Sequence, residues 1–142
     1  MKFTARGQLI KTWGTPGKGT GQFDLPHSIL VDATNRVLVG DRENDRIQVF
    51  DLDGNRLAIW NGVAPYGLAL DRSDRLFVAD GRANQLVRLD AQGKVDLRWG
   101  KKGGRAGEFT LPHMLAIDHD GNVYVAEVGG ERFLKVKPIV GR

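Results

Sequence analysis

The sequence predicts an all-β protein built from repeated four-stranded sheets, and three observations carry this prediction. First, the segment 21–27 (GQFDLPH) returns at 107–113 (GEFTLPH), and a degenerate copy lies between them at 63–71. Second, short runs rich in Val, Ile, Leu and Phe alternate with polar or small residues along the chain. Third, turn pairs such as Asp53-Gly54, Gln92-Gly93 and Asp120-Gly121 separate the runs, and no long helical periodicity is present.

The repeat length narrows the fold class to a β-propeller. His27 and His113 lie 86 residues apart, so two periods average 43 residues, which is within the range of propeller blades. The expected strands are 29–32, 36–39, 46–50 and 56–60, then 67–70, 75–78, 85–89 and 95–99, then 115–117, 122–125 and 132–136. We therefore expect blades at 21–62, 63–105 and 106–142, preceded by a strand and linker at 1–20.

The third period stops after its third strand, whereas the N-terminus carries a strand without a blade. The segment 8–14 resembles the outer strands that end in Trp60-Asn61 and Trp99-Gly100. Three blades form half a ring, so this strand cannot complete the third blade of its own chain. The sequence therefore predicts a homodimer with exchanged N-terminal strands and six blades, which would also cover exposed sheet edges.

Composition excludes several other classes. The 142-residue chain is 41% hydrophobic and contains 19 glycines but no cysteine, so disulfides and thiolate metal sites are excluded. Its 21 basic and 17 acidic residues are interspersed, which indicates a solvated surface and disfavours nucleic acid as a partner. Lys101, Lys102 and Arg105 are the candidate RNA contact, although their place in a Gly-rich loop favours a solvated linker. Residues 1–7 have no apolar signal core, so we expect a cytoplasmic protein without a membrane partner, or a secreted one if the chain is part of a longer protein.

Two motifs carry a family resemblance. Asn44-Asp45-Arg46-Ile47 and Asn84-Gln85-Leu86 stand where NHL repeats have their Asn-His-Leu pattern, although neither copy keeps the histidine. The chain therefore resembles the NHL-repeat β-propellers over nearly its whole length.

A narrower resemblance is to the peptidyl-α-hydroxyglycine α-amidating lyases. It is carried by the segments 25–28 (LPHS), 41–48 (DRENDRIQ), 111–113 (LPH) and 126–130 (AEVGG). The resemblance implies a six-bladed zinc enzyme that releases glyoxylate, with zinc held by histidines of three alternate blades. By motif match, His27 and His113 fall on zinc-ligand positions and Arg42 on an active-site arginine. Met114 departs from the pattern because that family often has Asp there. Blades for the first zinc histidine and the catalytic tyrosine are missing, and the expected dimer would offer only His27, His113 and the partner's Tyr66.

Neighbouring strands of a blade run in opposite directions, so the start of the first strand and the end of the second share one face of the ring. The residues expected on this channel face are His27, Asp41, Arg42, Glu43, Tyr66, Asp80, Arg82, His113 and Glu127. Among them, His27 and His113 are the candidate zinc ligands, because neutral imidazole suits zinc. Arg42 and Tyr66 are the candidate catalytic residues, and Arg42, Glu43, Asp80, Arg82 and Glu127 are the candidate ligand-binding residues, since a guanidinium pairs with carboxylate.

Each of these residues also has a plain structural explanation. A histidine before an inner strand can bond a neighbouring backbone carbonyl, residues 41–44 can be a charged turn, and Tyr66 can be a packing residue. Trp13, Trp60 and Trp99 are expected to pack between blades, and His119 to lie in a solvated turn. Two function classes follow: a binding module that uses the channel face lined by His27, Tyr66 and His113, or a zinc-dependent lyase-like enzyme.

Overall fold

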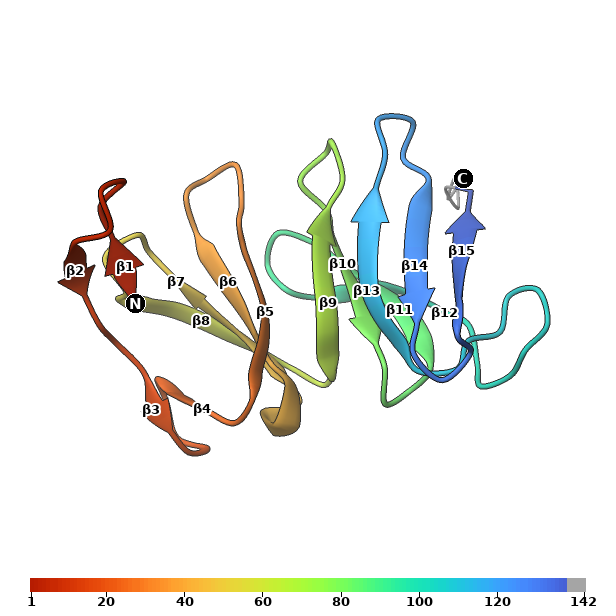
Figure 1. The fold of residues 1–142 in the computed structure, drawn as a ribbon, viewed down its shortest axis with the longest axis horizontal. Coiled ribbons are helices and arrows are strands. Elements are labelled where there is room, and N and C mark those ends of the chain that lie inside the picture. Colours follow the sequence, from red (N-terminus) through yellow and green to blue (C-terminus); the bar gives the residue numbers. More distant parts are fainter. Residues whose placement is uncertain (138–142) are drawn as a thin grey trace.

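The computed structural model describes residues 1–137, which form β-strands and one short 3-10 turn, Arg42–Asn44. Two four-stranded antiparallel sheets and one three-stranded sheet stand side by side (Figure 1). We call them the first blade (β5 Pro26–Val31, β6 Val37–Asp41, β7 Arg46–Phe50, β8 Arg56–Asn61), the second blade (β9 Pro65–Leu70, β10 Leu76–Asp80, β11 Gln85–Leu89, β12 Val95–Trp99) and the third blade (β13 Pro112–Ile117, β14 Val123–Glu127, β15 Arg132–Val136). The all-β prediction is confirmed, and every strand expected from the repeat is present.

The third strands of all three blades and the outer strand of the second blade have the predicted bounds. The inner strands β5, β9 and β13 begin two or three residues earlier than expected, and the second strands β6, β10 and β14 end two residues later. The strands are longer than the alternating apolar pattern predicts, because the hydrogen-bonded ladder continues past an irregularity near the start of each inner strand. Whether the third blade has a fourth strand lies outside the described residues.

The predicted turns hold the strands in register. In the turn between β7 and β8, Oδ1 of Asp51 accepts hydrogen bonds from the backbone N–H groups of Asp53 and Asn55, at 2.9 and 2.8 Å. Gly54 follows with φ of 79°, a left-handed conformation that glycine adopts without steric cost. The same arrangement recurs around Gly93 and Gly121, with φ of 81° and 80°.

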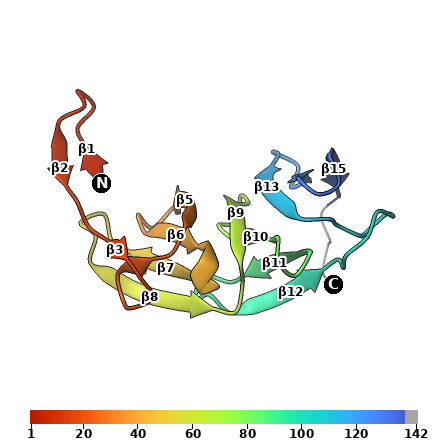
Figure 2. The same ribbon diagram turned by 60° about the horizontal axis from the view of Figure 1, so that its bottom comes forward.

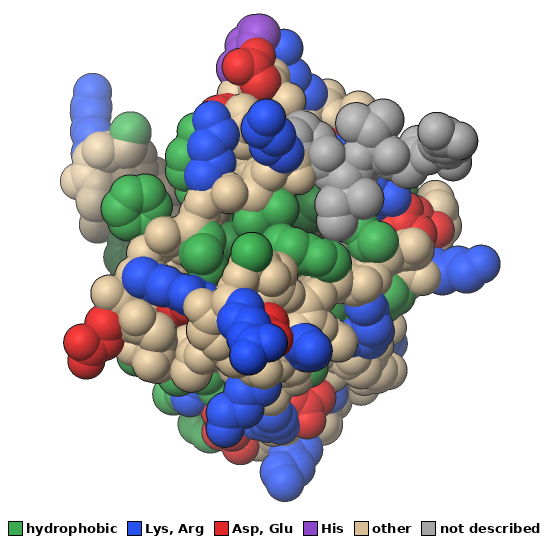
Figure 3. Space-filling view, turned by 90° about the vertical axis from the view of Figure 1, so that its right-hand side faces the viewer, with side chains coloured by type: hydrophobic (Ala, Val, Ile, Leu, Met, Phe, Trp, Pro, Cys, Tyr) green, Lys and Arg blue, Asp and Glu red, His purple; other side chains and the backbone are tan. Residues whose placement is uncertain are grey.

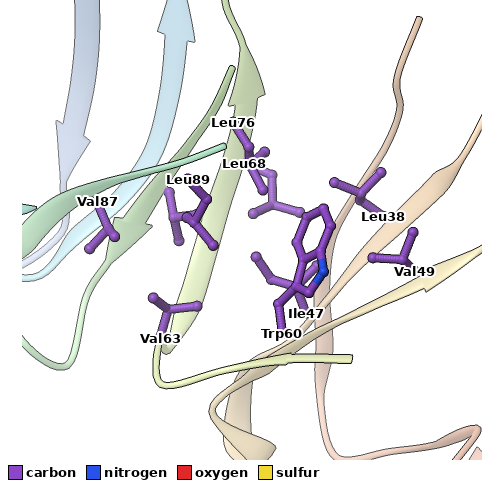
Figure 4. Packing of buried hydrophobic residues seen from close by; sticks show 10 residues of the cluster. Leu38, Ile47, Val49, Trp60, Val63, Leu68, Leu76, Val87 and Leu89 are labelled. Atoms are coloured by element: carbon purple, nitrogen blue, oxygen red, sulfur yellow. The ribbon is translucent and has the colours of Figure 1, made fainter. Parts of the chain in front are cut away.

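The core consists of layers between neighbouring blades. The larger layer joins the first and second blades and includes Leu38, Ile47, Trp60, Leu68 and Leu76 (Figure 4). A second layer joins the second and third blades, where Phe109 stacks edge-on against Trp99 at 5.0 Å. The apolar faces of neighbouring blades therefore stabilise each other at these two interfaces.

The N-terminal segment lies against the open face of the first blade. It contains a hairpin of β1 (Lys2–Phe3) and β2 (Leu9–Lys11) and a short parallel pair of β3 (Thr15–Pro16) and β4 (Gln22–Phe23). The hairpin extends away from the blades (Figure 2). The segment expected to complete a blade is thus paired with β1 here, and its exchange between two chains stays a prediction.

Within residues 1–137, no helix is long and apolar enough to cross a membrane.

Candidate functional site

Three aromatic rings from three blades meet at one end of the inner strands. The ring centroids of His27 and His113 lie 4.7 Å apart, and Tyr66 lies 5.7 Å from His27 and 5.4 Å from His113. Each ring belongs to a different inner strand, β5, β9 or β13. The structure therefore brings together the three residues predicted to line the channel face.

A β-bulge positions each of these rings. Pro26 pairs with Asp41 and Ser28 with Gly40, so His27 is the extra residue between two ladder pairs. Tyr66 and His113 occupy the same bulge position in β9 and β13. A bulge redirects a side chain out of the alternating pattern, and a preceding proline is tolerated there because no ladder donor is needed. The Pro-His and Pro-Tyr pairs thus turn three rings toward one point.

Close blade packing allows the rings to meet. A Cβ added to Gly67 would lie 2.8 Å from the carbonyl oxygen of His113, and one added to Gly81 would lie 2.7 Å from the Tyr66 ring. Only glycine permits this approach without displacing the neighbouring strand. The second and third blades therefore approach each other closely beside the ring cluster.

His27 has a fixed orientation. Its Nδ1 lies 2.7 Å from the carbonyl oxygen of Tyr66, which can only accept a hydrogen bond. In the neutral form the proton therefore resides on Nδ1, and Nε2 keeps a lone pair. Nδ1 thus makes the bond to a neighbouring backbone carbonyl that the plain structural explanation of this histidine expects. Nε2 stays available for a ligand.

Burial is the largest cause of a lowered pKa at His113, followed by the positive charges of His27 and Arg42 nearby. All three causes disfavour the imidazolium form. At neutral pH His113 is therefore an uncharged imidazole that can accept or donate one hydrogen bond.

Arg42 adds a cation beside the three rings. Its guanidinium carbon lies 4.6 Å from the centroid of the Tyr66 ring, a cation–π distance, and its Nε donates to Glu43 at 2.8 Å. Glu43 also pairs with Arg82 at 3.1 Å. Arg82 in turn donates to Asp45 at 2.6 Å, and this ion pair joins the first two blades. The site thus has a fixed cation at its rim, held by alternating charges.

Two of the predicted ligand-binding carboxylates are buried under the loops. Glu127 accepts hydrogen bonds from the Thr110 N–H at 2.9 Å and from Nε of Arg132 at 2.7 Å. Asp80 accepts one from the Ala83 N–H at 3.0 Å. These contacts make both carboxylates part of the scaffold, and the structure does not bring them into the ring cluster. Their part in ligand binding stays a prediction.

Sequence reasoning missed two features of this region. Asp45, the partner of Arg82, lies in the Asn-His-Leu-like motif and has φ of 50°. A hollow of about 230 Å³ beside His27 is lined by Pro26, Ser28, Ile29 and Val39. The repeated Pro-His motif indicated where the site lies. It could not indicate the apolar wall of the hollow, because that wall depends on the packing of strands that lie apart in the sequence.

Zinc binding at this place stays a prediction. Catalytic zinc takes three protein ligands, and no group of three His, Cys, Asp or Glu side chains in residues 1–137 is arranged to hold a metal. His27 and His113 provide two imidazoles only.

Comparisons with known proteins agree with the repeat analysis. Residues 23–50, which span the first three strands of the first blade, match the family model of the NHL repeat. NHL repeat-containing protein 3 from Homo sapiens is 34% identical over 152 residues, covering 98% of this chain and 43% of that protein. The chain belongs to the NHL-repeat family.

Other relatives of this NHL-repeat chain include enzymes. A probable peptidyl-alpha-hydroxyglycine alpha-amidating lyase from Caenorhabditis elegans is 27% identical over 151 residues, covering 96% of this chain and 42% of that protein. The virginiamycin B lyase structure from Staphylococcus aureus aligns with a TM-score of 0.71 at 16% identity, over 98% of this chain and 48% of that one, which shows a shared fold. The NHL-repeat chain spans about two fifths of the length of the curated relatives named here.

Proposed function

We propose that this NHL-repeat protein is a binding module whose channel face holds a ligand bearing a carboxylate next to an apolar group. The observation that carries the proposal is the convergence of His27, Tyr66 and His113 under the guanidinium of Arg42. The guanidinium supplies a fixed positive charge, and the three ring faces supply apolar contact. Peptide termini and small organic acids have this chemistry.

The experiment is calorimetric titration with N-acetylphenylalanine, which carries both groups, and with its uncharged amide. We expect the acid to bind and the amide to bind at least fivefold more weakly. Arg42→Gln should weaken acid binding about tenfold, because a charge-assisted hydrogen bond contributes about 1.5 kcal/mol at a partly exposed site. Arg42→Lys should lose less, because it keeps the charge but not the planar fork.

Arg75→Gln is the matched control. Arg75 pairs with Asp71 at 2.7 Å in the turn at the opposite end of β9 from Tyr66, so its loss should leave binding unchanged. Equal affinities of the acid and the amide, or equal effects of Arg42→Gln and Arg75→Gln, would contradict the proposed site.

The second candidate is a lyase-like enzyme, favoured by the imidazoles of His27 and His113 at 4.7 Å and by the similarity to the amidating lyase of Caenorhabditis elegans. Its test is release of glyoxylate from a peptidyl-α-hydroxyglycine by protein of known zinc content. Stoichiometric zinc and glyoxylate, both lost in His27→Ala, would favour the enzyme. Neither would be expected of a binding module, which needs no metal.

A further inference from the structure

The first and third blades each have one apolar face that no other blade covers within residues 1–137. They stand at the two ends of the array, and the second blade lies between them (Figure 1). Figure 3 looks onto the end of the molecule where β14 and β15 lie, and a band of hydrophobic side chains crosses this end between basic residues. The exposure of residues on these two end faces can be compared with that of equivalent residues at the two interfaces between blades of the same chain.

On the third blade, the exposed position is Phe133. It pairs with Ala126, as Ile47 pairs with Gly40 and Leu86 with Ala79, so these three apolar residues occupy one position in successive blades. Ile47 is 0% and Leu86 is 5% exposed, because the next blade covers each of them. Phe133 is 78% exposed.

On the first blade, the exposed position is Ile29. It pairs with Val39, as Leu68 pairs with Val78 and Leu115 with Val125. Leu68 is 8% and Leu115 is 9% exposed, since each packs on the preceding blade, whereas Ile29 is 67% exposed. The two ends therefore expose opposite halves of the same interface.

The covered interfaces show how these halves fit. Leu68 belongs to the core layer that contains Ile47, and Leu115 belongs to the layer that contains Leu86. An inner-strand residue of one blade thus shares a layer with the third-strand residue of the blade before it. By the same rule, Ile29 would share a layer with Phe133 of a preceding blade. One chain cannot bring these two residues together, because they lie at opposite ends of its array of blades.

The N-terminal segment continues this pattern. Trp60, at the end of the outer strand of the first blade, packs over Gly93 in the second blade, and Trp13 packs in the same way over Gly54 in the first. Trp13 therefore occupies the place that the outer strand of a preceding blade would take. The open face of the first blade is already arranged to receive another blade.

We propose that the first blade docks on the third blade of a second copy of this chain, so that Ile29 packs against the partner's Phe133. The two-fold symmetry of such a pair creates this junction twice and covers both end faces. Burial of large apolar side chains at both junctions provides the driving force. The proposal concerns assembly and does not depend on the ligand of the channel face.

The test begins with the mass in solution, measured by light scattering on a chromatography peak of the whole chain. We expect twice the chain mass of 15.7 kDa. Phe133→Asp and Ile29→Lys should each raise the dissociation constant about a hundredfold, because a charge would be buried against an apolar residue at both junctions. Val128→Asp is the control, since Val128 is an exposed apolar residue in the turn between β14 and β15, outside the paired strands of the sheet.

Mixing the two variants distinguishes this arrangement from any other dimer. In a mixed pair, one junction keeps Ile29 against Phe133, and the other places the new Lys opposite the new Asp. The mixture should therefore form dimers at concentrations at which each variant alone is monomeric. Circular dichroism at each step checks that the variants are folded.

A folded, monomeric wild-type chain would overturn the proposal. So would a dimer that survives both substitutions, or a mixture of the two variants that remains monomeric. Any of these results would mean that the first blade of one copy does not dock on the third blade of another.

Discussion

Asp41 offers the most direct test of how the first blade is held together. Its carboxylate is fully buried and accepts hydrogen bonds from Nε of Arg46 at 2.7 Å, from the Asp24 N–H at 2.8 Å, and from the side-chain amides of Asn44 and Gln48. Asp41→Ala would leave these donors without their acceptor and Arg46 without its counter-charge. The size of the expected loss in the free energy of unfolding depends mainly on the buried ion pair between Asp41 and Arg46.

Removal of one partner of a buried ion pair costs about 3–5 kcal/mol. Arg46 would still donate to the carbonyl oxygens of Lys18, Gly19 and Gln22, at 2.8–2.9 Å, so part of its hydrogen bonding is retained. We therefore expect Asp41→Ala to lower the free energy of unfolding by about 3 kcal/mol, near the low end of that range. This is a large share of the stability of a typical domain, about 5–15 kcal/mol.

Asp80 provides a matched control because it occupies the same position in the second blade. It accepts a hydrogen bond from the Ala83 N–H, and its nearest cation, Arg98, is half-exposed and 3.9 Å away. We expect Asp80→Ala to cost about 1 kcal/mol, close to the loss of one hydrogen bond. Both aspartates end the second strand of a blade, but Asp41 is paired with Arg46, whereas Asp80 is paired with Gln85.

The assay is urea denaturation followed by tryptophan fluorescence, at one fixed protein concentration because association changes apparent stability. The free energies of unfolding of the two variants should differ by about 2 kcal/mol. Equal losses, or a loss below about 1 kcal/mol for Asp41→Ala, would refute the view that the carboxylate of Asp41 holds the loop before β5 on the first blade.

Two further predictions concern the rings and the turns. The pKa of His113, measured by NMR from its imidazole C–H resonances, should lie below 6.5, and His27→Ala should remove only the smaller part of the depression because burial is its main cause. Because the pKa of His113 is lower in the folded than in the unfolded state, protonation favours unfolding. The contribution of His113 should therefore lower the free energy of unfolding as pH falls below about 6.5, and it should level off below the folded pKa. A measured pKa of 6.5 or higher would contradict the burial argument. Gly93→Ala should cost about 3 kcal/mol in the same urea assay, because φ is 81° there and the new Cβ would overlap the Trp60 ring, whereas Ala91→Gly, in the exposed part of the same turn, should cost far less.

The sequence alone determined the class of the fold and the place of the strands. Alternating apolar runs, turn pairs and a repeat averaging 43 residues predicted every strand of the three blades. These are local signals, since they depend on side-chain period and turn chemistry within a few residues. The same repeat placed His27, Tyr66 and His113 at equivalent positions, and the structure brings their rings together.

Only the tertiary structure decided what each repeated residue contacts. Asp80 and Glu127 follow the pattern of a channel-face ligand, but their carboxylates are used by backbone N–H groups of nearby loops. Phe133 has the same position as Ile47 and Leu86, yet it is exposed because no blade follows it among the described residues. A repeat makes positions alike in sequence, whereas burial and partners depend on the neighbouring blade about 40 residues away, which no local pattern contains.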